Sequence, residues 1–250
     1  MKIDIEESCY PNGALKHRYH YCNDLPHRED GPAQEDFYED GIIKSYSYHI
    51  NGKLHRKGGP AAESFFEDGA IESRRYYHTG ECHREDGPAV ETFYESGKLE
   101  SRRYYYRDEL HRADGPAFES FHANGILVAC NWYIGGKFHR DGGPTREGFY
   151  ENGTIKYREW HEHDLVHRDD GPASEIFDEK GRYESRTWSI RDKLHREDGP
   201  AHEYLSKDGQ VIRSAYYLDD HLLTKHEYQR AIALRRLTVQ TVAEGCDVLL

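Results

Sequence analysis

Polar and apolar residues alternate along a short stretch that returns every 28 residues. Residues 33–38 read Ala-Gln-Glu-Asp-Phe-Tyr, and six further copies follow the same pattern. Successive side chains of a strand point to opposite faces, so Ala, Glu and Phe share one face. At these positions the Glu is invariant, Ala becomes Thr145 once and Phe becomes Leu205 once. The pattern predicts a strand whose Ala/Glu/Phe face packs inward and whose other face meets solvent.

A turn follows each of these strands. Asp-Gly and Asn-Gly pairs between alternating runs favour a tight β-hairpin with positive φ at both turn positions. An aliphatic residue and, five positions later, an aromatic residue follow the turn. This odd offset places them on opposite faces unless a bulge intervenes, and both alternatives remain open. A second turn is clear at Asn51-Gly52 and Gly135-Gly136 but blurred at Asp108-Glu109 and Arg191-Asp192. The invariant turn glycines are Gly41, Gly69, Gly97, Gly125, Gly153, Gly181 and Gly209.

The string His-Arg-x-(Asp/Gly)-Gly-Pro occurs once in each of these seven copies. A degenerate copy precedes them, with Glu7, Asn12-Gly13 and Leu15 in register. A fixed period of this length indicates units that bury their apolar faces only against neighbouring units. We therefore expect an all-β, elongated open array of stacked β-hairpin repeats over 1–220, about eight units with the first at 3–30. The histidines are His27, His55, His83, His111, His139, His167 and His195.

The C-terminal segment, 221–250, departs from the repeat. Thr224-Lys225-His226-Glu227 has the form of a capping box, which predicts a helix reaching about Ala243, with Gly245 as a stop signal. Such a helix would cap the last strand edge. The apolar tail 248–250 is an alternative surface for a partner or a second copy. The apolar side of the helix would consist of Tyr228, Ala231, Ile232, Leu234 and Ala243.

Composition narrows the function. With 46 acidic and 34 basic residues the net charge is −12, which disfavours a nucleic-acid binder. Mean hydropathy is −0.99, but 20 tyrosines can bury their rings in a thin sheet. No apolar run is long enough for a membrane span, and no signal peptide is recognisable. The cysteines have neither disulfide nor zinc spacing, so we expect reduced thiols in a cytoplasm. They are Cys9, Cys22, Cys82, Cys130 and Cys246.

The repeated His, Arg and Glu invite a catalytic or metal-binding interpretation. The Asp of the motif is replaced by Gly58 and Gly142, which indicates a backbone role at this position. We expect the motif arginines (Arg28, Arg56, Arg84 and their equivalents) to pair with the Glu column, bidentate where geometry permits, and each His to donate to a turn carbonyl. No P-loop, nucleophilic triad or His-Glu-x-x-His occurs, and His161-Glu162-His163 lacks a third ligand. We expect no enzyme activity, metal or cofactor, and keep an enzyme or metal protein using the His columns as an alternative.

Function is then expected at variable outward positions. The residue after the inward Phe is aromatic or His in five consecutive copies, and exposed aromatic side chains are favoured interface anchors. Packing on cross-strand neighbours such as Arg74 and Arg102 is the alternative. The candidate partner-binding residues are Tyr38, Phe66, Tyr94, His122 and Tyr150. We expect a non-enzymatic scaffold that binds a protein partner, with an acidic decoy for a nucleic-acid-binding site as a second hypothesis.

The pattern Tyr/Trp-x-x-Asn-Gly-x-Leu-His-Arg-x-Asp-Gly-Pro-Ala resembles tandem repeats of uncharacterised bacterial and phage proteins, distant variants of the MORN repeat. The resemblance covers about 3–220 and implies β-hairpin units stacked into an elongated twisted sheet. The MORN pattern is shorter, and its dense Gly-x-Gly spacing does not occur here. The occurrence of such arrays in phage-like genomes implies a further hypothesis: an inhibitor of a host defence protein, acting in the host cytoplasm.

Overall fold

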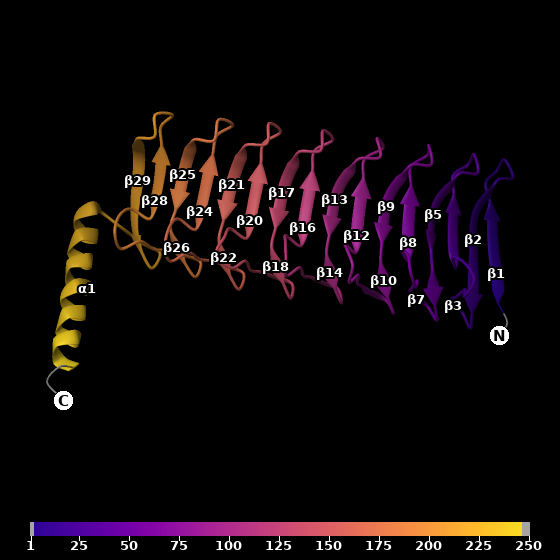
Figure 1. The fold of residues 1–250 in the computed structure, drawn as a ribbon, viewed down its shortest axis with the longest axis horizontal. Coiled ribbons are helices and arrows are strands. Elements are labelled where there is room, and N and C mark those ends of the chain that lie inside the picture. The colour runs from indigo at the N-terminus through magenta and orange to yellow at the C-terminus, as the bar shows by residue number, and fades with distance from the viewer. Residues whose placement is uncertain (1–2, 247–250) are drawn as a thin grey trace. The chain divides into compact units, whose positions relative to one another are not determined.

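The computed structural model describes residues 3–246, with side chains to residue 237. It forms two compact units, Met1–Lys137 and Phe138–Leu250, called here the N-unit and the C-unit. In each unit long antiparallel hairpins follow one another in chain order (Figure 1), which confirms the predicted all-β hairpin repeats. The N-unit hairpins are β1 (Asp4–Cys9) with β2 (Leu15–Cys22), β4 (Gln34–Phe37) with β5 (Ile43–Ser47), β8 (Ala62–Phe65) with β9 (Ile71–Arg75), β12 (Val90–Phe93) with β13 (Leu99–Arg103), and β16 (Phe118–Phe121) with β17 (Leu127–Asn131). Those of the C-unit are β20 (Arg146–Phe149) with β21 (Ile155–Glu159), β24 (Ser174–Phe177) with β25 (Tyr183–Thr187), and β28 (His202–Leu205) with β29 (Val211–Leu218).

The long hairpins turn through three residues, not through the predicted primed turn. The Gly41 N–H donates to the Tyr38 carbonyl (2.9 Å), and the Tyr38 N–H donates to the Ile42 carbonyl (2.8 Å). Gly41 has a φ of 87°, whereas Asp40 is not left-handed. This is a type I turn closed by a left-handed glycine, the second common hairpin connection. The register then skips one residue in each long hairpin, so a β-bulge accounts for the odd aliphatic-to-aromatic offset.

The primed turns occur instead at the second turn of each repeat. Arg107 and Asp108 have φ values of 50° and 64°, so the blurred turn lies at Arg107-Asp108. The Asp108 carboxylate accepts from the Cys82 N–H (2.7 Å), and the Asp108 N–H donates to the Cys82 carbonyl (3.0 Å). These bonds join a turn to the preceding repeat. Short strands flank the turns: β3 (Leu25–Pro26), β6 (His49–Ile50), β7 (Lys53–Leu54), β10 (Tyr77–His78), β11 (Glu81–Cys82), β14 (Tyr105–Tyr106), β15 (Glu109–Leu110), β18 (Tyr133–Ile134), β19 (Lys137–Phe138), β22 (His161–Glu162), β23 (Leu165–Val166), β26 (Ser189–Ile190), β27 (Lys193–Leu194) and β30 (His221–Leu223).

The two faces of each sheet carry different rows of side chains. One, the ladder face, carries in the N-unit Glu7, Arg18, Glu35, Tyr46, Glu63, Arg74, Glu91, Arg102, Glu119 and Cys130 on successive strands. Its inward orientation is confirmed, since Glu63 and Glu119 are each 9% exposed. The other, the groove face, carries Asp36, Ser45, Ser64, Ser73, Thr92, Ser101 and Ser120. The expectation that this face simply meets solvent is wrong for its central row: Ser73 and Ser101 are buried, because short hydroxyls pair closely across the strands (Ser64–Ser73, 2.8 Å).

Helix α1 (Lys225–Cys246) follows the last hairpin, and its capping box is confirmed. The Glu227 N–H donates to the Thr224 hydroxyl (3.3 Å), and the Glu227 carboxylate accepts from the Thr224 N–H (2.9 Å). The helix extends past the predicted end at Ala243. Leu234 is 61% exposed and does not belong to the buried side as predicted. The side chain of Ala243 and the tail 248–250 lie outside the described parts. The packed cluster joins Tyr228, Ala231 and Ile232 to Tyr216, Leu218 and Leu223.

Candidate functional site

The charges of the ladder face are paired internally. Arg102 donates to Glu119 through Nε (2.6 Å) and Nη2 (3.0 Å), while the Arg112 Nη1 lies 3.6 Å from the same carboxylate. In the C-unit Arg186 donates to Glu203 through Nη2 alone (2.6 Å). The prediction that motif arginines lie near the Glu column is confirmed at 3.2–4.0 Å in five copies, but the bidentate pair is made by the strand residue Arg102.

Each motif arginine also holds its own loop together. Arg112 donates to Asp114 (2.9 Å) and to the Pro116 carbonyl (3.4 Å), and its guanidinium lies 4.1 Å from the Tyr104 ring centroid. The same stacking explains the aromatic column in other repeats, including Arg196 over a tryptophan at 3.7 Å. The prediction of a purely backbone role for the motif Asp is therefore wrong. The Asp114 carboxylate accepts a hydrogen bond from Arg112, which lowers the pKa of Asp114. The Gly copies use a left-handed loop instead, with φ values of 80° and 69°.

The motif histidines accept a hydrogen bond where donation was expected. The Nδ1 of His27 accepts from the Asn51 N–H (3.0 Å), and the Nδ1 of His111 accepts from the Gly135 N–H (3.1 Å). The donor is the first residue of the primed turn in the next repeat. Equivalent bonds occur at His55, His83, His167 and His195. These histidines tie consecutive repeats together.

Among the side chains that the structure describes, up to residue 237, no group of three or more His, Cys, Asp or Glu is placed to hold a metal ion. The His161-Glu162-His163 spot is divided: His161 is half-buried, and desolvation lowers the pKa of its imidazole, whereas His163 is exposed at a turn. Absence of enzyme activity, metal and cofactor remains a prediction. No helix in the described part of the chain has the length and apolar character needed to cross a bilayer.

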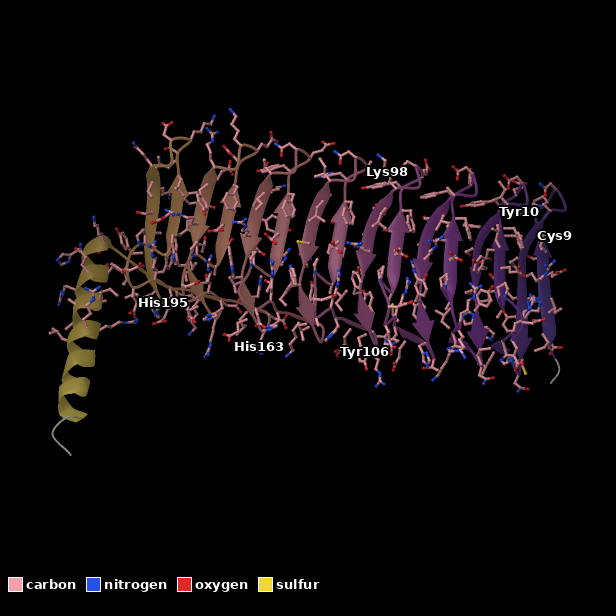
Figure 2. All side chains as sticks on the ribbon, in the orientation of Figure 1. Cys9, Tyr10, Lys98, Tyr106, His163 and His195 are labelled. Atoms are coloured by element: carbon pink, nitrogen blue, oxygen red, sulfur yellow. The ribbon has the colours of Figure 1, made fainter. Side chains whose placement is uncertain are left out.

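The structure shows a common role for the predicted tyrosines. Tyr38, Tyr94 and Tyr150 each donate their hydroxyl to the carbonyl of an inward residue 27 positions later, in the next repeat (2.7–2.8 Å). They are half-buried and lie near the three-residue turns, as does Tyr10 in Figure 2, whereas Tyr106 lies at the opposite ends of the strands. Their hydroxyls are therefore committed to the array, and ring surface remains exposed.

Two predicted residues cannot make this bond in the same way. Phe66 has no hydroxyl, and the Nε2 of His122 is buried without a partner among the described atoms. Arg74 and Arg102, named as examples of cross-strand neighbours on which the outward aromatic residues could pack, are not their partners. Those guanidiniums lie on the ladder face, 5.6 Å and 5.7 Å from the ring centroids of inward Phe residues.

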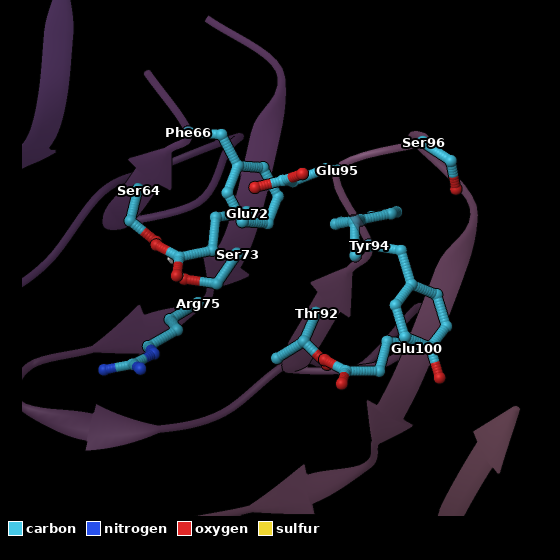
Figure 3. Close-up of a pocket in the computed structure, with 11 residues that line it drawn as sticks. Ser64, Phe66, Glu72, Ser73, Arg75, Thr92, Tyr94, Glu95, Ser96 and Glu100 are labelled. Carbon is cyan, nitrogen blue, oxygen red and sulfur yellow. Dashed lines mark hydrogen bonds between the residues drawn. The ribbon is translucent and has the colours of Figure 1, made fainter. Parts of the chain in front are cut away.

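Phe66 and Tyr94 border a groove of about 660 Å³ on the groove face of the N-unit. Ser64, Ser73 and Thr92 line it, and three exposed carboxylates surround the two rings (Figure 3). The Arg75 guanidinium points away from the rings. Tyr38, His122 and Tyr150 do not line this groove, so it brings together two of the five predicted residues. The carboxylates are Glu72, Glu95 and Glu100.

Sequence reasoning missed a second, more apolar groove in the C-unit. It has a volume of about 550 Å³ and is lined by Ile176, Tyr183, Tyr204 and Ile212, among others. These four side chains are 37–69% exposed. A signal was present in the sequence: the groove-face row is mostly Ser or Thr in the N-unit, but the C-unit row includes Tyr157, Ile176 and Tyr204.

The comparisons with known proteins support the repeat type. The family described as MORN repeat variant matches residues 89–107, which contain the hairpin of β12 and β13. No match to a curated protein was found. The crystal structures of TcdB2-TccC3-Cdc42 and of TcdB2-TccC3 match 84% and 88% of this chain, at 11% and 9% identity and TM-scores of 0.18 and 0.16. This chain spans 11% and 14% of the matched chains, and scores this low bear on neither fold nor function. The chain thus contains a MORN-like repeat.

Proposed function

We propose that the protein is a non-enzymatic repeat scaffold that binds a protein partner along its groove face. The single observation that supports this is the contrast between the faces. On the ladder face, charges are neutralised by neighbouring repeats, whereas the groove face presents exposed aromatic, apolar and acidic side chains around open grooves. Concave surfaces lined by aromatic residues favour protein recognition. Cys22 and Cys82 are buried thiols without a disulfide, which supports a reducing cytoplasm.

Affinity capture tests the proposal. The tagged chain and a Phe66→Ser/Tyr94→Ser variant are incubated with lysate from the native host, and captured proteins are quantified by mass spectrometry. Loss of two central anchors should weaken binding of a specific partner by roughly 1,000-fold and abolish its capture, since each hot-spot residue contributes ~2 kcal/mol or more and every 1.4 kcal/mol is about tenfold. Tyr106→Ser, which removes an aromatic residue 50% exposed at the other end of the strands, is the matched control. Undiminished capture by a double variant that unfolds cooperatively contradicts the proposal.

The finer hypothesis is that the partner is a host defence protein that the chain inhibits. A second candidate, an acidic decoy for a nucleic-acid-binding site, is favoured by the three carboxylates beside Phe66 and Tyr94. Salt separates the two. Binding by charge mimicry should weaken steeply between low and physiological ionic strength, whereas binding through aromatic anchors should change little.

A further inference from the structure

One outward position of the repeat holds a cation over the neighbouring aromatic ring. The Lys44 ammonium lies 5.6 Å from the ring centroid of Tyr38, six residues earlier. The same pair recurs as Lys16 over Tyr10 (5.7 Å) and as Lys156 over Tyr150 (5.6 Å). An ammonium group within about 6 Å of an aromatic face is attracted by the negative potential of the ring. In these three repeats the chain therefore supplies its own cation to the outward ring.

The two repeats around the N-unit groove reverse this arrangement. The position six residues after Phe66 is Glu72, and the position six residues after Tyr94 is Glu100. Both rings line the groove, and both carboxylates are exposed beside them (Figure 3). The nearby cation Lys98 does not replace the missing ammonium, because its Nζ donates to the Ala123 carbonyl in the next repeat (2.7 Å).

A second difference from the other repeats, Phe66 in place of a tyrosine, leaves space at the same groove. In other repeats a tyrosine hydroxyl donates to the inward carbonyl of the next repeat, as Tyr94 does to the Phe121 carbonyl (2.7 Å). Phe66 takes the place of the donating tyrosine at the groove, and the carbonyl that it would reach belongs to Phe93, 27 residues later. Both residues line the groove, but Phe66 has no hydroxyl to donate to the Phe93 carbonyl. An aromatic face, carboxylates and a backbone acceptor thus lie around one open volume of about 660 Å³.

We infer that this groove binds a lysine or arginine side chain of the partner, which takes the place that Lys44 and its equivalents occupy in the other repeats. The inference rests on the proposed function and names the chemistry of its partner: a protein segment carrying exposed basic residues. The complementarity is local, because Glu72, Glu95 and Glu100 surround the two rings, and it agrees with the net charge of −12.

The test uses the full chain with 4-fluorophenylalanine at position 66 as a single ¹⁹F NMR reporter, titrated with acetylated tetralysine amide at physiological salt. We expect a saturable shift of the reporter. Glu72→Lys/Glu100→Lys should weaken binding by about tenfold or more, since the new lysines fill the groove as in the sister repeats. This variant should fold normally, because lysine already occupies the equivalent position in three repeats. Phe66→Tyr, studied without the reporter by calorimetry, should also weaken binding.

The matched control is Glu39→Lys/Glu179→Lys, which makes the same change in net charge at exposed turn positions outside the groove. Equal weakening by both double variants would mean general charge attraction and would overturn the inference, as would the absence of any reporter shift. If a partner is captured through Phe66 and Tyr94 but tetralysine gives no response, the cation site is refuted and the proposed function is not. A tetralysine response without any captured partner would refute the proposed function and leave the cation site standing.

Discussion

Removing one carboxylate from the ladder face should destabilise the N-unit strongly. Glu119 is 9% exposed and accepts two hydrogen bonds from Arg102, with Arg112 3.6 Å away. Glu119→Ala leaves the Arg102 guanidinium without its hydrogen-bonded carboxylate, whereas Arg112 keeps its bond to Asp114. Breaking a buried ion pair costs ~3–5 kcal/mol, but the side chains of Arg102 and Arg112 are 35% and 24% exposed, and solvent screening reduces the cost to about 2–3 kcal/mol. The melting temperature should then fall by roughly 4–10 °C.

Calorimetry and urea unfolding followed by circular dichroism measure this change. Asp114→Gly is the control, because Asp114 contacts Arg112 from an exposed position and glycine occupies the equivalent place in two repeats. Glu119→Gln, which keeps the volume and one acceptor, should lie between the two. If Glu119→Ala and Asp114→Gly lower stability equally and slightly, the ladder does not hold the repeats together and the reasoning fails.

Three further predictions concern pH, the helix and packing. Burial lowers the pKa of His49 and His161 below the ordinary 6.5, so the unfolded chain binds protons at a higher pH than the folded chain does. The free energy of unfolding should be at its full value above pH 6.5 and fall as the pH drops below it. His49→Gln/His161→Gln should flatten this pH dependence, measured by urea titrations at a series of pH values. Ile232→Ala should loosen the helix, raising hydrogen exchange over 225–237 while exchange in the N-unit stays unchanged. Gly148→Ala should cost ~1–3 kcal/mol, measured by urea unfolding, because its Cβ would enter the Tyr157 ring; a neutral Gly148→Ala would show that the ring moves freely.

The period of 28 residues was sufficient to predict the hairpins and the inward Glu column, and the Thr224–Glu227 signature was sufficient to predict the capping box. These features depend on local pattern, and each recurs or follows a known signature. The primed turn was predicted at the first turn of the repeat, whereas the first turn has three residues and a bulge and the primed φ values occur at the second turn. The Asp108 carboxylate bonds to an N–H 26 residues away, and no local signal shows that. For the same reason the sequence did not show that His27 accepts a hydrogen bond.

The candidate site was predicted in part. Phe66 and Tyr94 were selected as outward aromatic residues, and the structure brings them together at one groove. The predicted set treated Tyr38 and Tyr150 as equivalent to them. The structure distinguishes them by the lysine over each ring. The sequence shows the difference six residues after each aromatic residue, as Lys44 after Tyr38 and Glu72 after Phe66. The sequence alone does not show that the two positions are neighbours, because this depends on the turn geometry, which places position 44 beside position 38.

Site-specific photo-crosslinking tests the central claim, that the groove face binds a protein, most directly. Benzoylphenylalanine at position 66 or 94 samples the groove, and the same residue at position 106 samples the other ends of the strands. After irradiation in native lysate, the account predicts one crosslinked protein species at positions 66 and 94 and none at 106. Crosslinking confined to position 106, or equal at all three positions, would contradict it.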